Sequence, residues 1–189
     1  MQNRPFLCIA ILIFYFGLNA FGASAQISET KIKASDASSK ASFGSAISID
    51  GNVMIVGSGG DDSNGTNSGS AYIFRHNGTA WFEEQKLTDP IPTASDRFGT
   101  AVSISGSVAL VGAPVDDDAG VRRGSVFVYR YSGTSWVLEQ KLNASASSVR
   151  VRGFGTTLSL NGNVAIIGET TNPNGSGEAF IFRYNGGTW

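Results

Sequence analysis

Short apolar runs alternate with glycine-rich polar segments along most of this chain. In residues 86–140, the segment Phe98 to Ile104 alternates apolar with small or polar residues, which is typical of a half-buried strand. Val108 to Val111 is a continuous apolar run, as in a strand that is buried on both faces. Ser125 to Tyr131 and Trp136 to Leu142 are rich in β-branched and aromatic residues and predict two more strands.

Turn residues separate these predicted strands. Ser105-Gly106 predicts a two-residue hairpin turn, and Ser132-Gly133-Thr134 predicts a second turn before the last strand. Pro114 to Arg123 is a polar loop between the second and third strands. Because strand side chains alternate, the third strand has two faces: one carries Val126, Val128 and Arg130, and the other carries Phe127, Tyr129 and Tyr131.

This pattern of predicted strands and turns occurs in three tandem repeats. Residues 31–85 and 86–140 are each 55 residues long, and residues 141–189 form a shorter third copy. Every copy has a Phe-Gly pair near its start and a tryptophan after its third predicted strand: Phe43-Gly44, Phe98-Gly99 and Phe154-Gly155, with Trp81, Trp136 and Trp189. A repeat of this length predicts stacked units that bury their apolar faces against their neighbours.

Four antiparallel strands in each of about three tandem repeats predict an all-β fold made of β-propeller blades. A β-solenoid is the alternative, but its coils are usually shorter. The Phe-Gly pairs are expected at equivalent positions, at the start of the first strand of each blade.

The N-terminus has the pattern of a signal peptide at residues 1–25. Arg4 precedes the apolar stretch Phe6 to Phe16, and Ala23-Ser24-Ala25 is a small-residue cleavage site, so the mature chain is expected to begin at Gln26. The apolar stretch is shorter than the roughly 20 residues of a spanning helix, so no membrane span is expected after cleavage. Residues 26–189 then form the propeller segment of a secreted or cell-surface protein, and cleavage removes Cys8, the one cysteine.

Charge and residue types exclude several functions. Fourteen Lys and Arg residues stand against 15 Asp and Glu, without a basic stripe, which argues against nucleic acid as a partner. With one histidine, His76, and no thiol in the mature chain, neither a histidine-rich nor a thiol-based site can be built. The sequence has no Gly-x-Ser-x-Gly elbow and no phosphate loop. We therefore expect no catalytic residues and no enzyme.

The repeats resemble a known family. The second copy matches best, through Phe98-Gly99, Gly112-Ala113-Pro114 and Gly124 to Tyr129. These residues resemble the FG-GAP repeat, the blade unit of the integrin α-subunit propeller and of many exported microbial proteins. The resemblance implies a non-enzymatic scaffold for binding or cell-surface adhesion, with an extracellular protein or glycan as its ligand.

The chain departs from this family where calcium binds. The resemblance implies an acidic loop between the first and second strands, but here that connection is a two-residue turn, which cannot wrap a cation with six or more ligands. No cofactor is expected, and calcium is disfavoured. Asp116, Asp117 and Asp118 are weak metal candidates in the next loop, where a solvated loop is the favoured interpretation because consecutive acids point in different directions.

Two other functions stay open at this point. A ring of sugar-binding sites at Trp81, Trp136 and Trp189 would make the chain a lectin, although a tryptophan once per blade is more often a packing residue. An exported hydrolase or lyase with carboxylates on the propeller loops is the other alternative. Four Asn-x-Ser/Thr sequons are interpreted as turn chemistry rather than glycan acceptors: Asn64, Asn77, Asn143 and Asn174.

Three blades cannot close a ring, since propellers have about four to eight. The chain is therefore expected to be a partial propeller, completed by further blades of a longer chain or by a second copy in a six-bladed ring. Gln26 to Ile32 resembles the fourth strand Trp81 to Leu87. We expect Gln26 to Lys33 to form a strand on the outer edge of Ala179 to Tyr184 or on a later blade.

Overall fold

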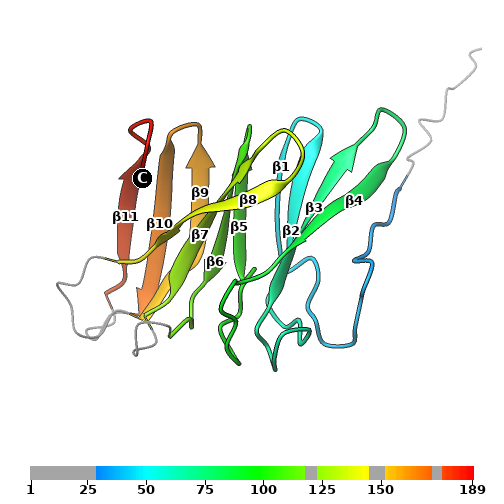
Figure 1. Ribbon diagram of the computed structural model, residues 1–189. Helices are drawn as coiled ribbons and strands as arrows, with labels where there is room; N and C mark the ends of the chain where they lie inside the picture. Colours follow the sequence, from blue (N-terminus) through cyan, green and yellow to red (C-terminus); the bar gives the residue numbers. More distant parts are fainter. Residues whose placement is uncertain (1–28, 118–122, 145–151, 172–175) are drawn as a thin grey trace, which may run out of the picture. The chain divides into compact units, whose positions relative to one another are not determined.

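The computed structural model describes residues 29–117, 123–144, 152–171 and 176–189 (Figure 1). The predicted signal peptide lies outside these residues. Within them the protein has eleven strands and no helix. The strands are β1 (Ala46–Asp50), β2 (Val53–Ser58), β3 (Ser70–His76), β4 (Trp81–Leu87), β5 (Ala101–Ser105), β6 (Val108–Ala113), β7 (Ser125–Tyr131), β8 (Trp136–Leu142), β9 (Arg152–Asn161), β10 (Val164–Thr171) and β11 (Glu178–Arg183).

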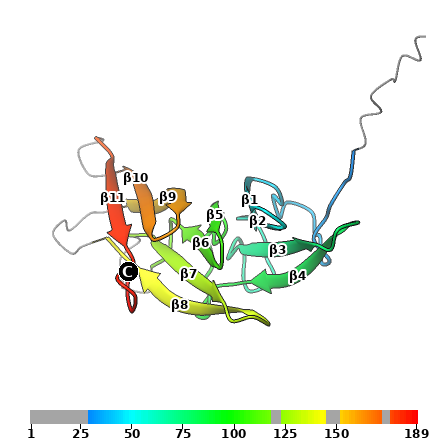
Figure 2. The ribbon, with the colours of Figure 1, turned by 90° about the horizontal axis from the view of Figure 1, so that it is seen from above.

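The strands form three antiparallel sheets, one for each repeat. The orders are β1-β2-β3-β4, β5-β6-β7-β8 and, for the three described strands of the third sheet, β11-β10-β9. Figure 2 shows the sheets following one another, with β1, β5 and β9 as neighbours. This architecture confirms the prediction of an all-β fold made of propeller blades, and we number the blades 1 to 3 along the chain.

The predicted bounds hold for β7 and β8 but not for the first strand of the second blade. That strand starts at Ala101 and not at Phe98. Gly99 has a φ of +89°, a left-handed conformation that turns the chain before it enters the sheet. Phe98 therefore lies in the turn that precedes β5.

The hairpin turn between the first two strands is shifted by one residue from the prediction. Ser105 pairs with Val108 as the last residues of the ladder in blade 2, so the two turn residues are Gly106 and Ser107. Gly51 has a φ of +57°, and the equivalent Gly106 has +56°. Glycine at the first central position is typical of the type II′ turn, whose twist matches that of the flanking strands.

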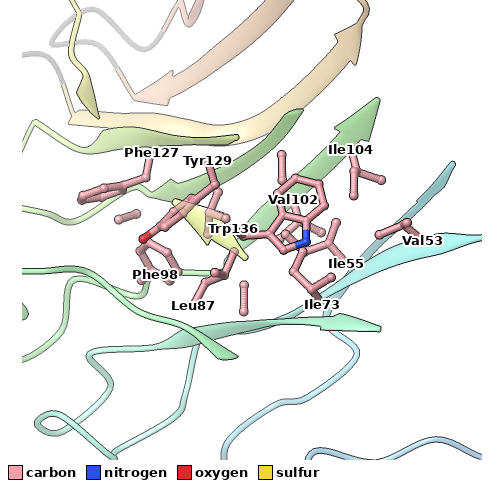
Figure 3. Close-up of a cluster of buried hydrophobic side chains, with 14 residues drawn as sticks. Val53, Ile55, Ile73, Leu87, Phe98, Val102, Ile104, Phe127, Tyr129 and Trp136 are labelled. Carbon is pink, nitrogen blue, oxygen red and sulfur yellow. The ribbon is translucent and has the colours of Figure 1, made fainter. Parts of the chain in front are cut away.

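Successive blades pack face to face through apolar side chains. Phe127 and Tyr129 of β7 belong to the cluster shared with blade 1, which also contains Ile55 and Ile73 (Figure 3). Val126, on the opposite face of β7, belongs with Val128 to the cluster shared with blade 3. The two faces predicted for this strand are therefore confirmed, and each is covered by a different neighbour.

The three Phe-Gly pairs occupy equivalent positions. Each phenylalanine meets two aromatic rings of the third strand of its own blade edge-on. Its ring centroids lie 5.5 and 6.1 Å away for Phe43, 5.2 and 6.3 Å for Phe98, and 5.4 and 6.1 Å for Phe154. Phe98 and Phe154 are fully buried, whereas Phe43 is half-buried, because no described blade packs against the outer face of blade 1.

The glycines of the motif let the backbones of adjacent blades approach. A Cβ atom on Gly57 would overlap the carbonyl oxygen of Gly99, and one on Gly112 would overlap that of Gly155. The Phe-Gly glycine of one blade therefore meets the strand-end glycine of the blade before it, and only glycine fits there.

The predicted N-terminal strand is wrong over the residues that can be examined. Gln26 to Ser28 lie outside the described residues, and Glu29 to Lys33 form no strand. Ile32 instead packs with Ala34 against the outer face of blade 1. The backbone N–H and the hydroxyl of Ser35 each donate a hydrogen bond of 2.8 Å to the Glu83 carboxylate of β4. These contacts hold the segment from Ile32 onward on blade 1.

Candidate functional site

A polar hollow of about 480 Å³ opens where blades 1 and 2 meet. Three segments line it: the entry to β1, the loop after β2 and the entry to β5. The residues on its wall are Lys40, Ser42, Ser45, Gly59, Gly60, Asn67, Arg97 and Thr100.

Backbone hydrogen bonds hold these three segments together. The N–H of Gly60 donates to the carbonyl of Ala41 at 3.1 Å, which ties the loop after β2 to the entry of β1. The N–H of Arg97 donates to the carbonyl of Asn67 at 3.1 Å, which ties the same loop to the entry of β5. The parallel bridge between Gly69 and Phe98 extends this second contact. The hollow is therefore formed by backbone that is fixed on both sides.

Several residues of the hollow have left-handed backbone conformations. The φ values are +70° for Lys40, +59° for Ser42, +52° for Asn67 and +57° for Arg97. Lys40 and Ser42 in the first repeat correspond to Ser95 and Arg97 in the second, and Ser95 also has a positive φ, of +76°. Left-handed backbone at these two positions is thus a repeated feature of the turn that leads into a blade. The charge and polarity of the hollow come from the side chains.

The side chains that line the hollow complement an anionic group. Its wall carries two cationic side chains, Lys40 and Arg97, both exposed, and no acidic or apolar side chain. A guanidinium presents paired N–H donors that match a carboxylate, sulfate or phosphate, and an ammonium adds a point charge. Prediction from the sequence missed this site, because no motif marks it and its cations are 57 residues apart in the chain.

Of the three acidic residues proposed as weak metal candidates, Asp116 and Asp117 both lie near the buried Asp96, whose carboxyl pKa is raised mainly by burial and further by their two charges. Asp116 is buried, with a carboxylate oxygen 2.6 Å from the Lys141 ammonium. Asp117 accepts a hydrogen bond of 3.3 Å from the hydroxyl of Thr93, and Asp118 lies outside the described residues. Within the residues that the structure describes, no group of three or more His, Cys, Asp or Glu side chains could hold a metal ion.

A repeated ion pair explains the acid at the start of this loop. Asp61 of blade 1 lies 3.4 Å from Lys86, as Asp116 of blade 2 lies beside Lys141. Acid and lysine are 25 residues apart in both copies, and this spacing is the signal in the sequence that could have revealed the pair. The pair ties the loop after the second strand to the fourth strand of the same blade.

The blade 1 pair extends into a small polar network. The hydroxyl of Tyr72 donates to Asp36 at 2.7 Å and to Asp61 at 3.1 Å. Burial raises the pKa of the Asp61 carboxyl, but hydrogen bonds from Ser63 and the charge of Lys86 outweigh it and hold this pKa below its usual value. The hydrogen bond from Lys86 also lowers the pKa of Asp36, whereas burial raises the pKa of the Tyr72 hydroxyl far above its ordinary range. Both carboxylates therefore stay ionised near neutral pH.

The repeated tryptophans are packing residues where both neighbouring blades are present. Trp136 is buried between blades 1 and 2; its backbone N–H donates to Gln85 at 2.7 Å and its indole N–H donates to Glu84 at 3.2 Å. Each tryptophan also contacts the aromatic residue at or directly after the end of the third strand. The ring-centroid distances are 5.1 Å for Trp81 with His76, 5.4 Å for Trp136 with Tyr131 and 5.6 Å for Trp189 with Tyr184.

The sequons lie in different places. Asn77 accepts hydrogen bonds of 3.0 Å from the N–H groups of Thr79 and Ala80, as the interpretation as turn chemistry predicts. Asn143 accepts a hydrogen bond of 2.7 Å from Ser125, and Asn64 is exposed. Asn174 lies outside the described residues.

Tandem antiparallel sheets that stack through Phe-Gly motifs define this chain as a segment of a β-propeller. The chain belongs to the FG-GAP repeat family, whose model matches residues 27–74 and 81–129, just over half of its length. The resemblance drawn from the sequence is therefore confirmed.

Comparison with solved structures shows similarity to the crystal structure of Saccharomyces cerevisiae Sqt1. The two share 14% sequence identity with a TM-score of 0.49, over 79% of this chain and 34% of that chain. The chain thus spans about a third of the solved protein it matches. No curated protein matches the chain. Among the residues that the structure describes, no helix is long and apolar enough to cross a membrane.

Proposed function

We propose that this protein is an exported, non-enzymatic β-propeller scaffold that binds an extracellular protein or glycan in cell-surface adhesion. Membership of the FG-GAP repeat family supports an extracellular role. The pattern of residues 1–25 supports export through a cleaved signal peptide.

The polar hollow between blades 1 and 2 is the ligand contact that we propose. Lys40 and Arg97 bring two positive charges to a wall without acidic side chains, and this is the observation that carries the proposal. An acidic group on the ligand, such as a carboxylate of a protein or a sulfate of a glycan, complements this charge. The lining residues belong to loops and strand entries that the rigid blades hold in place, and binding residues commonly lie on such loops.

The contacts of the acids and the histidine at repeated positions support a structural role for them. A carboxylate-dependent hydrolase would need two carboxyl groups that reach a substrate, whereas the acids that recur in the repeat, Asp61 and Asp116, are buried and paired with lysines. His76 packs against Trp81. The burial of Trp136 also argues against a lectin with one sugar site on every tryptophan.

A sulfated heparin oligosaccharide serves as the probe for the hollow, with its desulfated form as the uncharged counterpart. We expect the chain, expressed from its full coding sequence, to bind the sulfated form in calorimetry and to lose affinity as salt rises. Replacing Lys40→Gln and Arg97→Gln together should weaken binding roughly a hundredfold or more, because each charged hydrogen bond contributes about 1.5–3 kcal/mol.

Lys33→Gln is the matched control, since Lys33 is an exposed cation outside the hollow. Equal loss of affinity in this variant would show that general charge, and not the hollow, binds the probe. Absence of binding to the sulfated oligosaccharide and to acidic peptides would contradict the proposed ligand class.

A further inference from the structure

The turn between β3 and β4 carries an asparagine–glycine pair. Asn77 and Gly78 are both exposed, so water reaches them. In such a pair the backbone nitrogen of the glycine can attack the side-chain amide carbon of the asparagine, because glycine has no Cβ atom to hinder the approach. The attack expels ammonia and leaves a succinimide, which water opens to aspartate or isoaspartate. A base at the attacking nitrogen and donors at the carbonyl oxygen speed a reaction of this kind.

A base lies beside the attacking nitrogen. The N–H of Gly78 donates a hydrogen bond of 3.2 Å to Nδ1 of His76. An amide nitrogen is a poor nucleophile until it loses this proton, and a general base must lie within about 3.2 Å of the group that it deprotonates. Two contacts fix the imidazole in this place. Its ring centroid lies 5.1 Å from that of Trp81, and the backbone N–H of His76 donates to the carbonyl of Asn52 at 2.8 Å.

Two N–H donors point at the carbonyl oxygen that receives the attack. Oδ1 of Asn77 accepts hydrogen bonds of 3.0 Å from the N–H groups of both Thr79 and Ala80. Negative charge develops on this oxygen as the nitrogen attacks, and donors that are already in place stabilise it without reorganisation. The backbone N–H of Asn77 donates in turn to the carbonyl of Ala80 at 3.1 Å, which holds the turn closed.

We propose that this turn promotes its own deamidation, with His76 as the general base in the conversion of Asn77 to aspartate or isoaspartate. The imidazole takes the proton of the Gly78 nitrogen, which forms a bond to Cγ of Asn77 while the carbonyl electrons move to Oδ1. When the carbonyl forms again, the Cγ–Nδ2 bond breaks, and the imidazolium returns the proton to the departing nitrogen, which leaves as ammonia. Water then adds to one of the two succinimide carbonyls and breaks its bond to the ring nitrogen.

The reaction modifies the chain once and does not depend on the hollow in which we propose that a ligand binds. It replaces a neutral amide by a carboxylate on an exposed turn. In the aspartate product a carboxylate oxygen still accepts from the N–H groups of Thr79 and Ala80. In the isoaspartate product the main chain runs through the side-chain carbon of residue 77, which lengthens the turn by one atom.

Blade 3 contains the same turn after β11. Oδ1 of Asn185 accepts hydrogen bonds of 2.9 Å from the N–H groups of Gly187 and Thr188. The backbone N–H of Asn185 donates to the carbonyl of Thr188 at 3.1 Å. Gly186 has a φ of +100°, close to the +96° of Gly78. The electrophile, its two donors and the attacking nitrogen are thus the same in both blades.

The residue before the asparagine distinguishes the two turns. Blade 3 has Tyr184 where blade 1 has His76, and the tyrosine ring packs on Trp189 as the imidazole packs on Trp81. A phenol ring has no nitrogen to take the proton of the glycine N–H. The turn of blade 3 is therefore a control within the same protein, because it lacks the base alone.

Peptide mapping by mass spectrometry tests the proposal on the chain expressed from its full coding sequence. The purified chain is incubated at neutral pH and body temperature, and aspartate and isoaspartate are measured at each asparagine. We expect Asn77 to convert at least roughly tenfold faster than Asn185, because a positioned general base contributes about 10²–10⁴-fold in enzymes. His76→Tyr should slow the conversion of Asn77 to the rate of Asn185, and Tyr184→His should speed the conversion of Asn185.

Both substitutions introduce a side chain that already occurs at this repeat position, so both variants are expected to fold, and circular dichroism checks it. The same measurement in urea is the control for local sequence. The denatured wild type should lose most of the difference between the two asparagines, because the imidazole is no longer held beside the glycine nitrogen.

Three results would overturn the proposal. The first is an equal rate at Asn77 and Asn185 in the folded wild type, including no conversion at either. The second is an unchanged rate at Asn77 in the His76→Tyr variant. The third is a difference of the same size in urea, which would show that the histidine acts through the local sequence and that the folded turn has no part in the reaction.

Discussion

At the scale of single residues, the Phe-Gly motif does two separate things. The phenylalanine fills the space above two aromatic rings of its own blade, and the glycine lets the backbone of the preceding blade come close. The second role applies only where a preceding blade exists. Gly44 and Gly99 therefore form a natural pair, since both have left-handed backbone, with φ of +90° and +89°, but different surroundings.

Alanine at these two glycines separates the cost of the backbone conformation from the cost of crowding. Gly44→Ala should lower the free energy of unfolding by about 1–2 kcal/mol, the cost of left-handed φ for a residue with a Cβ, because nothing lies within 4 Å of the added atom. Gly99→Ala should cost at least about 2 kcal/mol more, as overpacking does, because its Cβ would overlap the carbonyl oxygen of Ser70.

Urea unfolding of both variants measures the difference. Equal losses of stability would contradict the view that the Phe-Gly glycine is needed for the approach of neighbouring blades.

At the scale of elements, each long loop is held by a lysine from the outer strand of its own blade. Lys86 anchors the loop after β2 through Asp61, and Lys141 anchors the loop after β6 through Asp116. Lys86 and Lys141 also lie over aromatic rings of the third strands, at 5.3 Å from the Tyr72 centroid and 4.9 Å from the Phe127 centroid. Each lysine ammonium thus makes both an ion pair with an aspartate and a cation–π contact with an aromatic ring.

The lowered pKa values of Asp36 and Asp61 predict that acid destabilises this region. A carboxyl with a lowered pKa in the folded state contributes stability that is present above its unfolded pKa of about 4 and is lost as the pH falls through the folded value. Lys86→Met should destabilise the protein by about 1–3 kcal/mol at pH 7, since the buried carboxylate of Asp61 loses its cation.

The difference in stability between wild type and Lys86→Met should shrink as the pH falls below about 4, because protonation removes the charge that the lysine stabilises. Thermal unfolding between neutral and acidic pH measures it, with Lys33→Met as the exposed control. A difference that does not depend on pH would show that Lys86 acts through packing alone.

At the scale of the whole molecule, successive blades stack through shared clusters of buried apolar side chains. We expect EDTA to leave the melting temperature almost unchanged. Differential scanning calorimetry with and without EDTA measures this, with added magnesium as the control for nonspecific ionic effects. A melting temperature that falls by several degrees with EDTA and returns with calcium would identify Asp116 and Asp117 as ligands.

Blade stacking also decides which apolar side chains are exposed to solvent and which are buried between blades. Repeat-equivalent residues such as Ile49 and Ile104 have the same local sequence pattern and opposite exposure. A position in the repeat therefore indicates which face a side chain occupies, and the neighbouring blade decides whether that face is covered.

Much of the fold could be predicted from the sequence because its information is local and repeated. The alternation of side chains along Ser125 to Tyr131 assigned both faces of β7, and three Phe-Gly pairs in register predicted equivalent blades. The starting residue of β5 and the position of the Gly106 turn were each missed, because a left-handed glycine can stand inside a strand, before it or in a turn.

The candidate site and the course of the N-terminal segment were decided by the tertiary structure. Lys40 and Arg97 belong to different repeats and come together only when the loop after β2 bridges two blades. Ile32 has the sequence context of an outer strand, yet it packs with Ala34 against the aromatic side chains of blade 1. The sequence by itself determined the strands of each blade and the two faces of those strands, through short-range periodicity. The tertiary structure alone decided which groups meet between blades, because such contacts depend on surfaces that lie far apart along the chain.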